Sequence, residues 1–162
     1  MNLKKIQVQK VKDKKRFVGI QPILDLGILS ATTWLAGGAL RTLIDSEDEI
    51  KDYDLFFQSA EAQVEVKNKL LAAGYELAYE CPLGHLFTFT RGTIKVQLIC
   101  ETTYKSIAEL LDSFDFTVTC AATDGEFIYL TREFVRHIIR KELRLSNLVY
   151  PVATFKRVVK YA

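Results

Sequence analysis

The feature that most constrains this chain is a strand end, a glycine pair and a helix start in immediate succession. The apolar run Trp34-Leu35-Ala36 is typical of the end of a buried strand, and Gly37 and Gly38 follow it directly. Residues 39–44 are rich in apolar side chains and predict a short helix. Paired glycines at such a turn let the backbone approach a phosphate, and the helix start offers N–H groups and the positive end of its dipole. We therefore predict an anion-binding turn here.

Two carboxylates follow a short distance along the chain. Asp52 and Asp54 precede the apolar residues Leu55, Phe56 and Phe57, and the segment predicts a strand. Residues two apart on a strand point to the same face, so both carboxylates can reach one divalent cation. Mg²⁺ prefers oxygen ligands and usually binds through one or two carboxylates together with substrate phosphates. The spacing therefore indicates a metal site beside a phosphate site.

The order of glycine pair, Arg41 and Asp-x-Asp strand resembles the nucleotidyltransferase superfamily of DNA polymerase beta. It is most similar to the head domain of poly(A) polymerases and CCA-adding enzymes, over roughly residues 30–161. The resemblance implies that Asp52 and Asp54 are catalytic and hold Mg²⁺ or Mn²⁺. It also implies nucleotide binding by Gly37, Gly38 and Arg41. Small proteins of this kind are encoded by tailed phages, so a phage origin is consistent with the pattern.

The chain departs from the family pattern at the third metal ligand. In the family, a strand beside the Asp-x-Asp strand commonly carries a third carboxylate. Residues 96–99, VQLI, resemble that strand with Gln97 in place of the acid. The Gln97 carbonyl can ligate a metal but adds no negative charge. Three explanations stay open: two carboxylates suffice, Glu101 or Asp115 substitutes, or the fold is kept without chemistry.

A second departure lies in residues 113–118, SFDFTV, which resemble the family motif Arg-Arg-Asp-Phe-Thr followed by an apolar strand. Asp115 and the two residues after it match the end of the motif. Ser113 and Phe114 stand where the resemblance implies two arginines that meet the triphosphate. The resemblance thus implies a nucleotide-binding role for Asp115. Without that role, Asp115 would bond local backbone N–H groups at the start of a strand.

Length and composition place the chain among ordinary globular proteins. We expect residues 1–17 to form a basic arm and residues 18–162 a single nucleotidyltransferase-like head domain without a neck. Hydrophobic residues make up 49% of the chain and charged residues 26%, which argues against disorder. There is no apolar run of membrane-spanning length and no secretory signal, so we expect a cytoplasmic protein, or a virion protein in a phage. Three cysteines without CxxC spacing predict reduced thiols rather than a zinc site.

Basic residues are concentrated in two places. Residues 1–16 carry seven basic side chains and one acid, although the net charge of the whole chain is only +2. Such an arm can attract RNA or DNA, or it is a solvated terminus, or a strand in which Ile6, Val8 and Lys10 alternate. A helix predicted over residues 131–144 carries a second stripe, which is either a nucleic-acid or triphosphate contact or a solvated face. The candidate nucleic-acid contacts are Lys12, Lys14, Lys15, Arg16, Arg132, Arg136 and Arg140.

The remaining pattern predicts an α/β (α+β) fold, a mixed twisted sheet with helices on its faces. Beyond the segments named above, it predicts helices over residues 59–74, 106–111 and 152–161, strands over 75–81, 85–91 and 93–100, and a hairpin of 116–123 with 126–130. In the last helix we expect one face to point inward and the other outward. The inward residues would be Phe155, Val158 and Val159, and the outward ones Lys156, Arg157 and Lys160.

Two classes of function are consistent with these residues. The first is a metal-dependent nucleotidyltransferase that transfers a nucleoside monophosphate from a nucleoside triphosphate such as ATP to a hydroxyl, with RNA as the expected acceptor. The second is a catalytically inactive module of the same fold that binds nucleic acid or acts as a structural or interaction protein, for example in a phage particle. The intact glycine pair and Asp-x-Asp favour the enzyme, which needs a nucleotide and Mg²⁺. The amide at Gln97, the missing arginines and the missing neck favour the inactive module, which would have protein partners.

Overall fold

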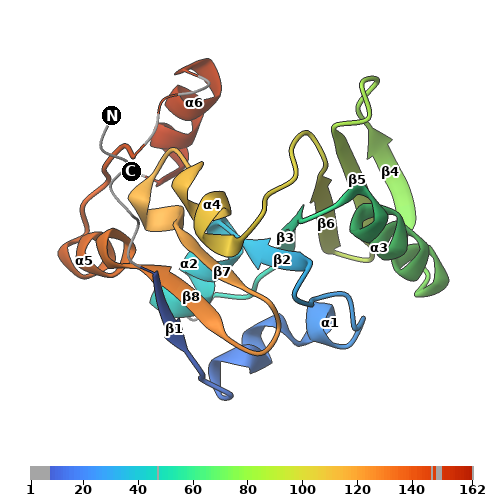
Figure 1. Ribbon diagram of the computed structural model, residues 1–162, viewed down its shortest axis with the longest axis horizontal. Coiled ribbons are helices and arrows are strands. Elements are labelled where there is room, and N and C mark those ends of the chain that lie inside the picture. The colour runs from blue at the N-terminus through green and yellow to red at the C-terminus, as the bar shows by residue number, and fades with distance from the viewer. Residues whose placement is uncertain (1–7, 47, 147, 149–150, 162) are drawn as a thin grey trace.

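The computed structural model describes residues 8–46, 48–146, 148 and 151–161, and within them eight strands form one mixed sheet (Figure 1). The strand order is β1-β8-β7-β2-β3-β6-β5-β4. Strand β3 pairs with β6 in parallel, whereas the other described pairs are antiparallel. The strands are β1 (Val8–Val11), β2 (Thr33–Ala36), β3 (Asp52–Phe57), β4 (Glu76–Glu80), β5 (Leu86–Arg91), β6 (Ile94–Ile99), β7 (Ala121–Thr123) and β8 (Ile128–Thr131).

Helices lie on both faces of the sheet and at its ends (Figure 1). Helix α3 lies beside the β4–β6 end of the sheet, and α5 lies at the end that carries β1. Helix α6 follows α5 in sequence and stands apart from the sheet at one corner of the molecule. The helices are α1 (Gln21–Leu24), α2 (Gly38–Asp45), α3 (Ala60–Ala72), α4 (Ile107–Asp112), α5 (Arg132–Arg140) and α6 (Pro151–Tyr161), with 3₁₀ helices η1 (Arg16–Ile20) and η2 (Thr117–Thr119).

The central strands are buried on both faces because two separate apolar clusters cover them. Tyr53, Leu55 and Phe57 on β3 point into the larger cluster, which also takes in side chains of α2 and α3. Phe56 points to the opposite face, where a smaller cluster includes Leu110 of α4. Alternate residues of a strand lie on opposite faces, so Asp52 and Asp54 share the face of the smaller cluster. The carboxylates therefore lie on the face of the sheet that α4 covers, on the side away from the larger core.

Three helices begin at side-chain caps that the sequence supplies. The hydroxyl oxygens of Ser59, Ser106 and Thr131 each accept a hydrogen bond from a backbone N–H three residues later, at 3.1–3.2 Å. A cap of this kind satisfies one of the N–H groups that a helix start leaves without an intrahelical acceptor. The starts of α3, α4 and α5 therefore follow from local chemistry.

The predicted fold class, a mixed twisted sheet flanked by helices, is confirmed, and two predicted boundaries are wrong. The helix predicted to run to residue 144 ends at Arg140, because Lys141 takes a left-handed conformation with φ of 54°. The strand predicted over residues 116–123 is reduced to β7, because η2 occupies its first half. The Thr117 hydroxyl lies 2.7 Å from Nδ1 of the buried His137, a tertiary contact that the strand pattern does not reveal.

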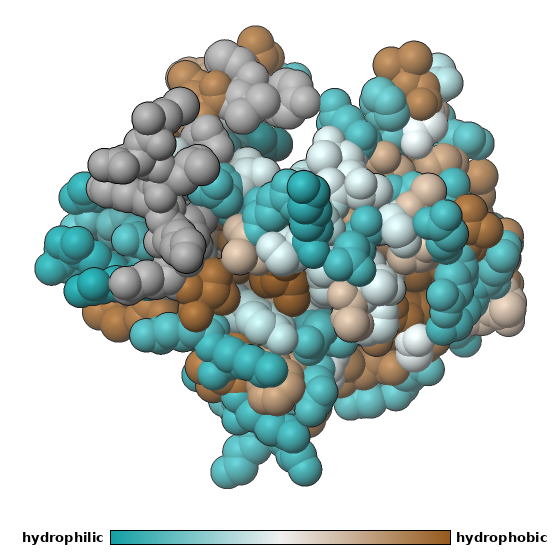
Figure 2. All heavy atoms as spheres, viewed as in Figure 1, coloured by the Kyte–Doolittle hydropathy of each residue, from teal (hydrophilic) through white to brown (hydrophobic). Residues whose placement is uncertain are grey.

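The predicted orientation of the last helix is wrong for Phe155, Val159 and Arg157, whereas Lys156 and Lys160 are exposed as predicted. Phe155 is 72% exposed and Val159 is 76% exposed, whereas Arg157 is partly buried and turned toward the body of the protein. Apolar residues accordingly reach the surface over α6 in the space-filling view (Figure 2). Helix α6 therefore docks through polar and aromatic side chains rather than through its aliphatic ones.

Part of the predicted basic arm belongs to the sheet. Residues 8–11 form β1 and pair with β8, so the strand alternative holds for them, while Ile6 lies outside the described residues. The ammonium group of Lys10 lies 3.6 Å from the centre of the Phe127 ring, a cation–π contact. The Arg16 guanidinium donates to the Leu43 and Ile44 carbonyls at the end of α2, at 3.3 and 3.0 Å. The division of the chain at residue 17 stays a prediction.

In the described part of the chain, no helix has both the length and the apolar character needed to cross a membrane.

Candidate functional site

The glycine turn has the geometry that the sequence predicts. Gly37 adopts φ of 81° and ψ of −136°, a conformation that a residue with a side chain takes only under strain. Its N–H donates to the Ala121 carbonyl at 3.2 Å, and its own carbonyl accepts from the N–H groups of Leu40 and Arg41 at 3.1 and 3.2 Å. Gly38 is the first residue of α2. Both glycines line one cavity, so the start of α2 faces that cavity.

The pairing of β2 with β3 brings the carboxylates to this turn. Ala36, the last residue of β2, lies opposite Asp54 in the antiparallel register. Asp54 is therefore one residue away from Gly37 across the sheet, and it lines the same cavity. Asp52 lies on the same face of β3 and is exposed. The structure thus brings the predicted phosphate turn and the predicted metal ligands together.

The surroundings of Asp54 favour its neutral form. Burial raises the pKa of the Asp54 carboxyl to about 6, and the negative charge of Asp52 adds to the increase. The positive charges of Lys160, Lys95 and Arg157 oppose the increase. A cation bound beside this carboxylate would strongly lower its pKa, because a nearby positive charge stabilises the ionised form.

Gln97 occupies the position beside Asp54 on the neighbouring strand. The parallel register of β3 and β6 sets Gln97 next to Asp54 and Lys95 next to Asp52. The Gln97 amide nitrogen donates to the Thr88 hydroxyl, at a long distance of 3.4 Å, and the carbonyl oxygen takes no part in this bond. Within the described ranges, no three His, Cys, Asp or Glu side chains come together as a metal site. The oxygen donors fit one cation that takes its remaining ligands from phosphates and water.

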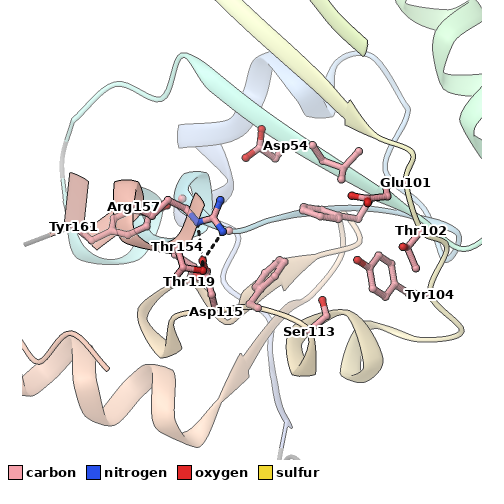
Figure 3. A pocket seen from close by; sticks show the side chains of 15 residues that line it. Asp54, Glu101, Thr102, Tyr104, Ser113, Asp115, Thr119, Thr154, Arg157 and Tyr161 are labelled. Atoms are coloured by element: carbon pink, nitrogen blue, oxygen red, sulfur yellow. Dashed lines mark hydrogen bonds and ion pairs between the residues drawn. The ribbon is translucent and has the colours of Figure 1, made fainter. Parts of the chain in front are cut away.

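The cavity has a volume of about 430 Å³, which is the size of a small-molecule site. In Figure 3 Arg157, Thr154 and Tyr161 border it at one end, Thr102 and Tyr104 border it at the other, and Asp54 lies between them. The surface of the molecule has a hollow between α6 and the β4–β5 hairpin (Figure 2). The lining residues are Gly37, Gly38, Asp54, Phe56, Ile99, Glu101, Thr102, Tyr104, Ser113, Phe114, Asp115, Thr119, Thr154, Arg157 and Tyr161.

Asp115 binds helix α6 rather than local backbone. Its Oδ2 accepts hydrogen bonds from Arg157 Nε at 2.7 Å and from the Thr154 hydroxyl at 3.0 Å. Arg157 Nη2 lies 2.5 Å from the same oxygen (Figure 3). The side chain of Asp115 is only 15% exposed, so the pair is stronger than a surface ion pair. Asp115 therefore fixes a guanidinium at the edge of the cavity.

Tyr161 packs over the glycine turn. Its ring meets Phe116 edge to face, with 5.8 Å between ring centres, and lies 5.1 Å from the guanidinium carbon of Arg41. A Cβ built on Gly38 would lie 3.5 Å from the Tyr161 hydroxyl oxygen. Arg41 Nε is enclosed and has no hydrogen-bond partner among the described residues. The guanidinium of Arg41 thus packs against Tyr161, and its predicted phosphate contact stays a prediction.

The predicted nucleic-acid contacts do not meet at the cavity. Arg132, Arg136 and Arg140 are exposed on α5, where they line a shallow groove with Gln9 and Val135. The N-terminal candidates Lys12, Lys14, Lys15 and Arg16 are also exposed, on the segment around η1. These residues do not line the cavity that Asp54 lines. Their role in nucleic-acid binding stays a prediction.

Sequence reasoning missed the α6 side of the cavity. Thr154, Arg157 and Tyr161 are spaced i, i+3 and i+7, so they form one stripe of a helix. The apolar residues Phe155 and Val159 lie on a different stripe. A prediction based on hydrophobicity alone therefore takes that stripe as the buried face. The helical spacing of these three residues was the signal available in the sequence. It identifies the buried face only once the contact between α6 and Asp115 is known.

The fold is that of the CCA-adding nucleotidyltransferases. A CCA-adding enzyme in complex with ATP superposes with a TM-score of 0.71 and 15% identity, over 96% of this chain and 41% of that one. A Thermotoga maritima CCA-adding enzyme complexed with tRNA gives 0.67 and 16%, over 96% and 40%. A tRNA nucleotidyltransferase with a primer tRNA and an incoming ATP analogue gives 0.56 and 21%, over 80% and 39%. The predicted nucleotidyltransferase fold is thereby confirmed.

Comparison of the sequence with known families identifies the particular family. Residues 3–141 match the family described as Gabija anti-defense 2 family protein, and the chain belongs to that family. A curated relative from Bacillus phage SPbetaL7, named Gabija anti-defense 2, is 27% identical over 130 residues. The match covers 78% of this chain and 32% of the relative, so the chain spans about a third of that protein's length.

The two glycines are expected to respond differently to alanine. Gly37→Ala forces a side chain into a conformation that costs on the order of 1–3 kcal/mol, so the melting temperature should fall. Gly38→Ala is the matched control, because its Cβ meets only an ordinary contact at 3.5 Å and alanine favours a helix. Thermal unfolding of both variants checks this expectation, and equal melting temperatures would contradict it.

Asp54→Asn is expected to stabilise the protein in a pH-dependent way when EDTA is present. The folded pKa of about 6 exceeds the usual value of 3.8, so ionisation of Asp54 opposes folding. This penalty appears as pH rises from about 4 to about 6 and reaches at most about 3 kcal/mol at neutral pH. Asn removes it, so the gain in free energy of unfolding should be present at pH 7.5 and absent below pH 4.

Denaturant unfolding at both pH values measures that gain. Asp48→Asn, at an exposed position between α2 and β3, is the matched control and should show no comparable change. A destabilised Asp54→Asn protein at pH 7.5 would show that the carboxylate is not penalised by burial.

Removal of the Asp115 carboxylate is expected to loosen α6. Asp115→Ala deletes the acceptor for Thr154 and Arg157, and hydrogen bonds to a charged group contribute about 1.5–3 kcal/mol each. Backbone amides in residues 154–161 should then exchange with solvent at least tenfold faster, while those of β3 stay protected. Lys156→Ala, an exposed change on the same helix, serves as the control. Unchanged exchange in Asp115→Ala would mean that other contacts hold the helix.

Proposed function

We propose that this chain is a metal-dependent nucleotidyltransferase that transfers a nucleoside monophosphate from a nucleoside triphosphate to a hydroxyl group. The observation that carries the proposal is the convergence of the glycine turn, Asp54 and Arg157 on one cavity. These groups come from three elements, and α6 is distant in sequence from the other two. The fold of the CCA-adding enzymes supports the same chemistry.

The phosphates would lie at the end of the cavity formed by the glycine turn and α6. Gly37 and Gly38 would let the chain approach the triphosphate closely, and the start of α2 would offer N–H groups to it. Arg157, held by Asp115, would place a positive charge beside the same phosphates. In this proposal Asp115 acts on the nucleotide through Arg157 rather than by direct contact.

Asp52 and Asp54 would hold Mg²⁺ or Mn²⁺, with the Gln97 carbonyl as a third, neutral oxygen donor. The bound metal would supply charge neutralisation and alignment of the reacting groups. The acceptor hydroxyl oxygen forms a bond to the α-phosphorus, and the bond from that phosphorus to the β-bridging oxygen breaks. Pyrophosphate leaves with the bonding electrons, and the hydroxyl proton passes to solvent. This chain's residues position the triphosphate and stabilise the charge on the leaving pyrophosphate.

The acceptor we propose is an RNA hydroxyl, because solved relatives of this fold were captured with tRNA. The exposed basic residues on α5 and near η1 would contact the RNA backbone away from the cavity. The family name places the phage relative in opposition to a defence named Gabija. We propose that nucleotide transfer is the chemistry by which this family acts there.

The second candidate is an inactive module that opposes the defence by binding a protein. Two observations favour it: Gln97 lies where the superfamily pattern has a third acid, and α6 exposes Phe155 and Val159. A bound protein would cover such residues. The transfer assay separates the two candidates, because only the first needs Asp52 and Asp54.

Transfer should depend on both carboxylates. Wild-type protein incubated with each α-labelled nucleoside triphosphate, total RNA and Mg²⁺ or Mn²⁺ should label the RNA. Asp52→Asn and Asp54→Asn should each lose at least a hundredfold in rate, because the metal loses a charged ligand. Asp45→Asn, at the exposed end of α2, should retain the wild-type rate.

The same assay can reject the enzyme outright. The enzyme is rejected if none of the four nucleotides gives a labelled product and calorimetry detects no metal-dependent triphosphate binding. The inactive module would then be the supported candidate. Label transfer that survives in both carboxylate variants would point to a contaminating enzyme.

A further inference from the structure

The end of the cavity opposite α6 has an aromatic wall. Phe56 comes from β3, Tyr104 from the loop after β6, and Phe114 from the residues after α4, and all three line the cavity. The ring centres of Phe56 and Phe114 are 5.4 Å apart with 60° between the rings. Those of Phe56 and Tyr104 are 6.3 Å apart with 67° between the rings. Figure 3 shows Tyr104 at this end and Arg157 at the other.

Backbone contacts hold the wall in place. The Tyr104 N–H donates to the Phe57 carbonyl at 3.0 Å, which ties the loop to the end of β3. Phe56 is buried and lies opposite Trp34 in the β2–β3 register. At the end of α4, the Ser113 hydroxyl donates to the Leu110 carbonyl at 2.6 Å, just before Phe114. These contacts fix the segments that carry the three rings.

The exposure of the three rings differs in a way that suits a ligand. Phe56 is 9% exposed and belongs to the smaller apolar cluster, so it forms the floor. Tyr104 and Phe114 are only partly buried, and both line the cavity. Exposed aromatic surface inside a cavity favours a flat, aromatic ligand, because stacking and apolar burial act together there.

The two ends of the cavity differ in chemistry. One end has the glycine turn and the Arg157 guanidinium, which suit phosphates, and the other has aromatic rings with the hydroxyls of Thr102 and Ser113 and the Glu101 carboxylate nearby. A nucleotide has the same division, with a charged phosphate end and an aromatic base. One ligand can therefore satisfy both ends of a single cavity.

We propose that Tyr104 and Phe114, over the floor made by Phe56, form a nucleobase subsite within this chain. The base of the nucleoside triphosphate stacks on these rings while its phosphates reach the glycine turn and Arg157. The inference rests on the proposed function, since both use the same cavity, and it names the part of the site that recognises the base. The competing explanation is that the rings only fill the apolar cluster around α4.

Calorimetry with two kinds of ligand tests the subsite. The protein, with Mg²⁺, is titrated with each of the four nucleoside triphosphates and with inorganic tripolyphosphate, which lacks a base. We expect the triphosphates with a base to bind at least tenfold more tightly than tripolyphosphate, because stacking on an aromatic side chain adds about this much. Trp34, the only tryptophan of the chain, gives a second readout through its fluorescence, since it lies opposite Phe56.

The variants separate stacking from packing. Tyr104→Leu and Phe114→Leu keep apolar volume and should weaken nucleotide binding about tenfold without changing the affinity for tripolyphosphate. Tyr104→Phe keeps the ring and should bind as the wild type does. Tyr79→Leu, at an exposed position on β4, is the control and should change neither affinity. Melting temperatures confirm that each variant is folded, and the wild-type comparison of nucleotides with tripolyphosphate tests the subsite if a leucine variant is not.

Each outcome has a distinct meaning. Equal affinity for tripolyphosphate and for all four nucleotides, or leucine variants that bind nucleotides normally, would overturn the base subsite while the transfer assay still supports the enzyme. Binding of neither nucleotides nor tripolyphosphate would overturn the proposed function and the subsite together. Selective loss of nucleotide affinity in the two leucine variants would support the subsite.

Discussion

The antiparallel pairing of β2 with β3 is the constraint on which the site depends. Ala36 lies opposite Asp54, so the chain leaves the sheet at Gly37 directly beside that carboxylate. A shift of one residue would turn Asp54 into the larger apolar cluster and bring Leu55 to the cavity. Tyr53 and Leu55 prevent such a shift, because both are fully buried on the other face of β3. The apolar core therefore sets the position of the carboxylate with respect to the glycine turn.

Helix α6 completes this arrangement from the far end of the described chain. The resemblance to the CCA-adding enzymes implies arginines just before Asp115, where this chain has Ser113 and Phe114. Here the guanidinium comes from Arg157, and Asp115 holds it. The aromatic Phe114 then faces the cavity at a position where the family motif has a charge.

Much of the sheet and half of the site could be predicted from sequence, because their geometry is determined by residues that are close together in the chain. Gly37, Gly38, Asp52 and Asp54 lie within one short stretch, where the strand period and turn chemistry determine the geometry. The role of Arg157 could not be predicted, because its contact with Asp115 joins residues 42 apart in sequence. Nor could the end of α5, because the turn at Lys141 has no glycine signal.

The way α6 is attached gives the cavity a sensitivity to ionic strength that the core lacks. Its contacts include an ion pair and hydrogen bonds to one carboxylate, while Phe155 and Val159 face water. The side chain of Arg157 is 41% exposed, so dissolved ions can screen its attraction to Asp115. The apolar clusters under α2, α3 and α4 respond little to the same ions. Salt therefore acts on one wall of the cavity and leaves the sheet beneath it unchanged.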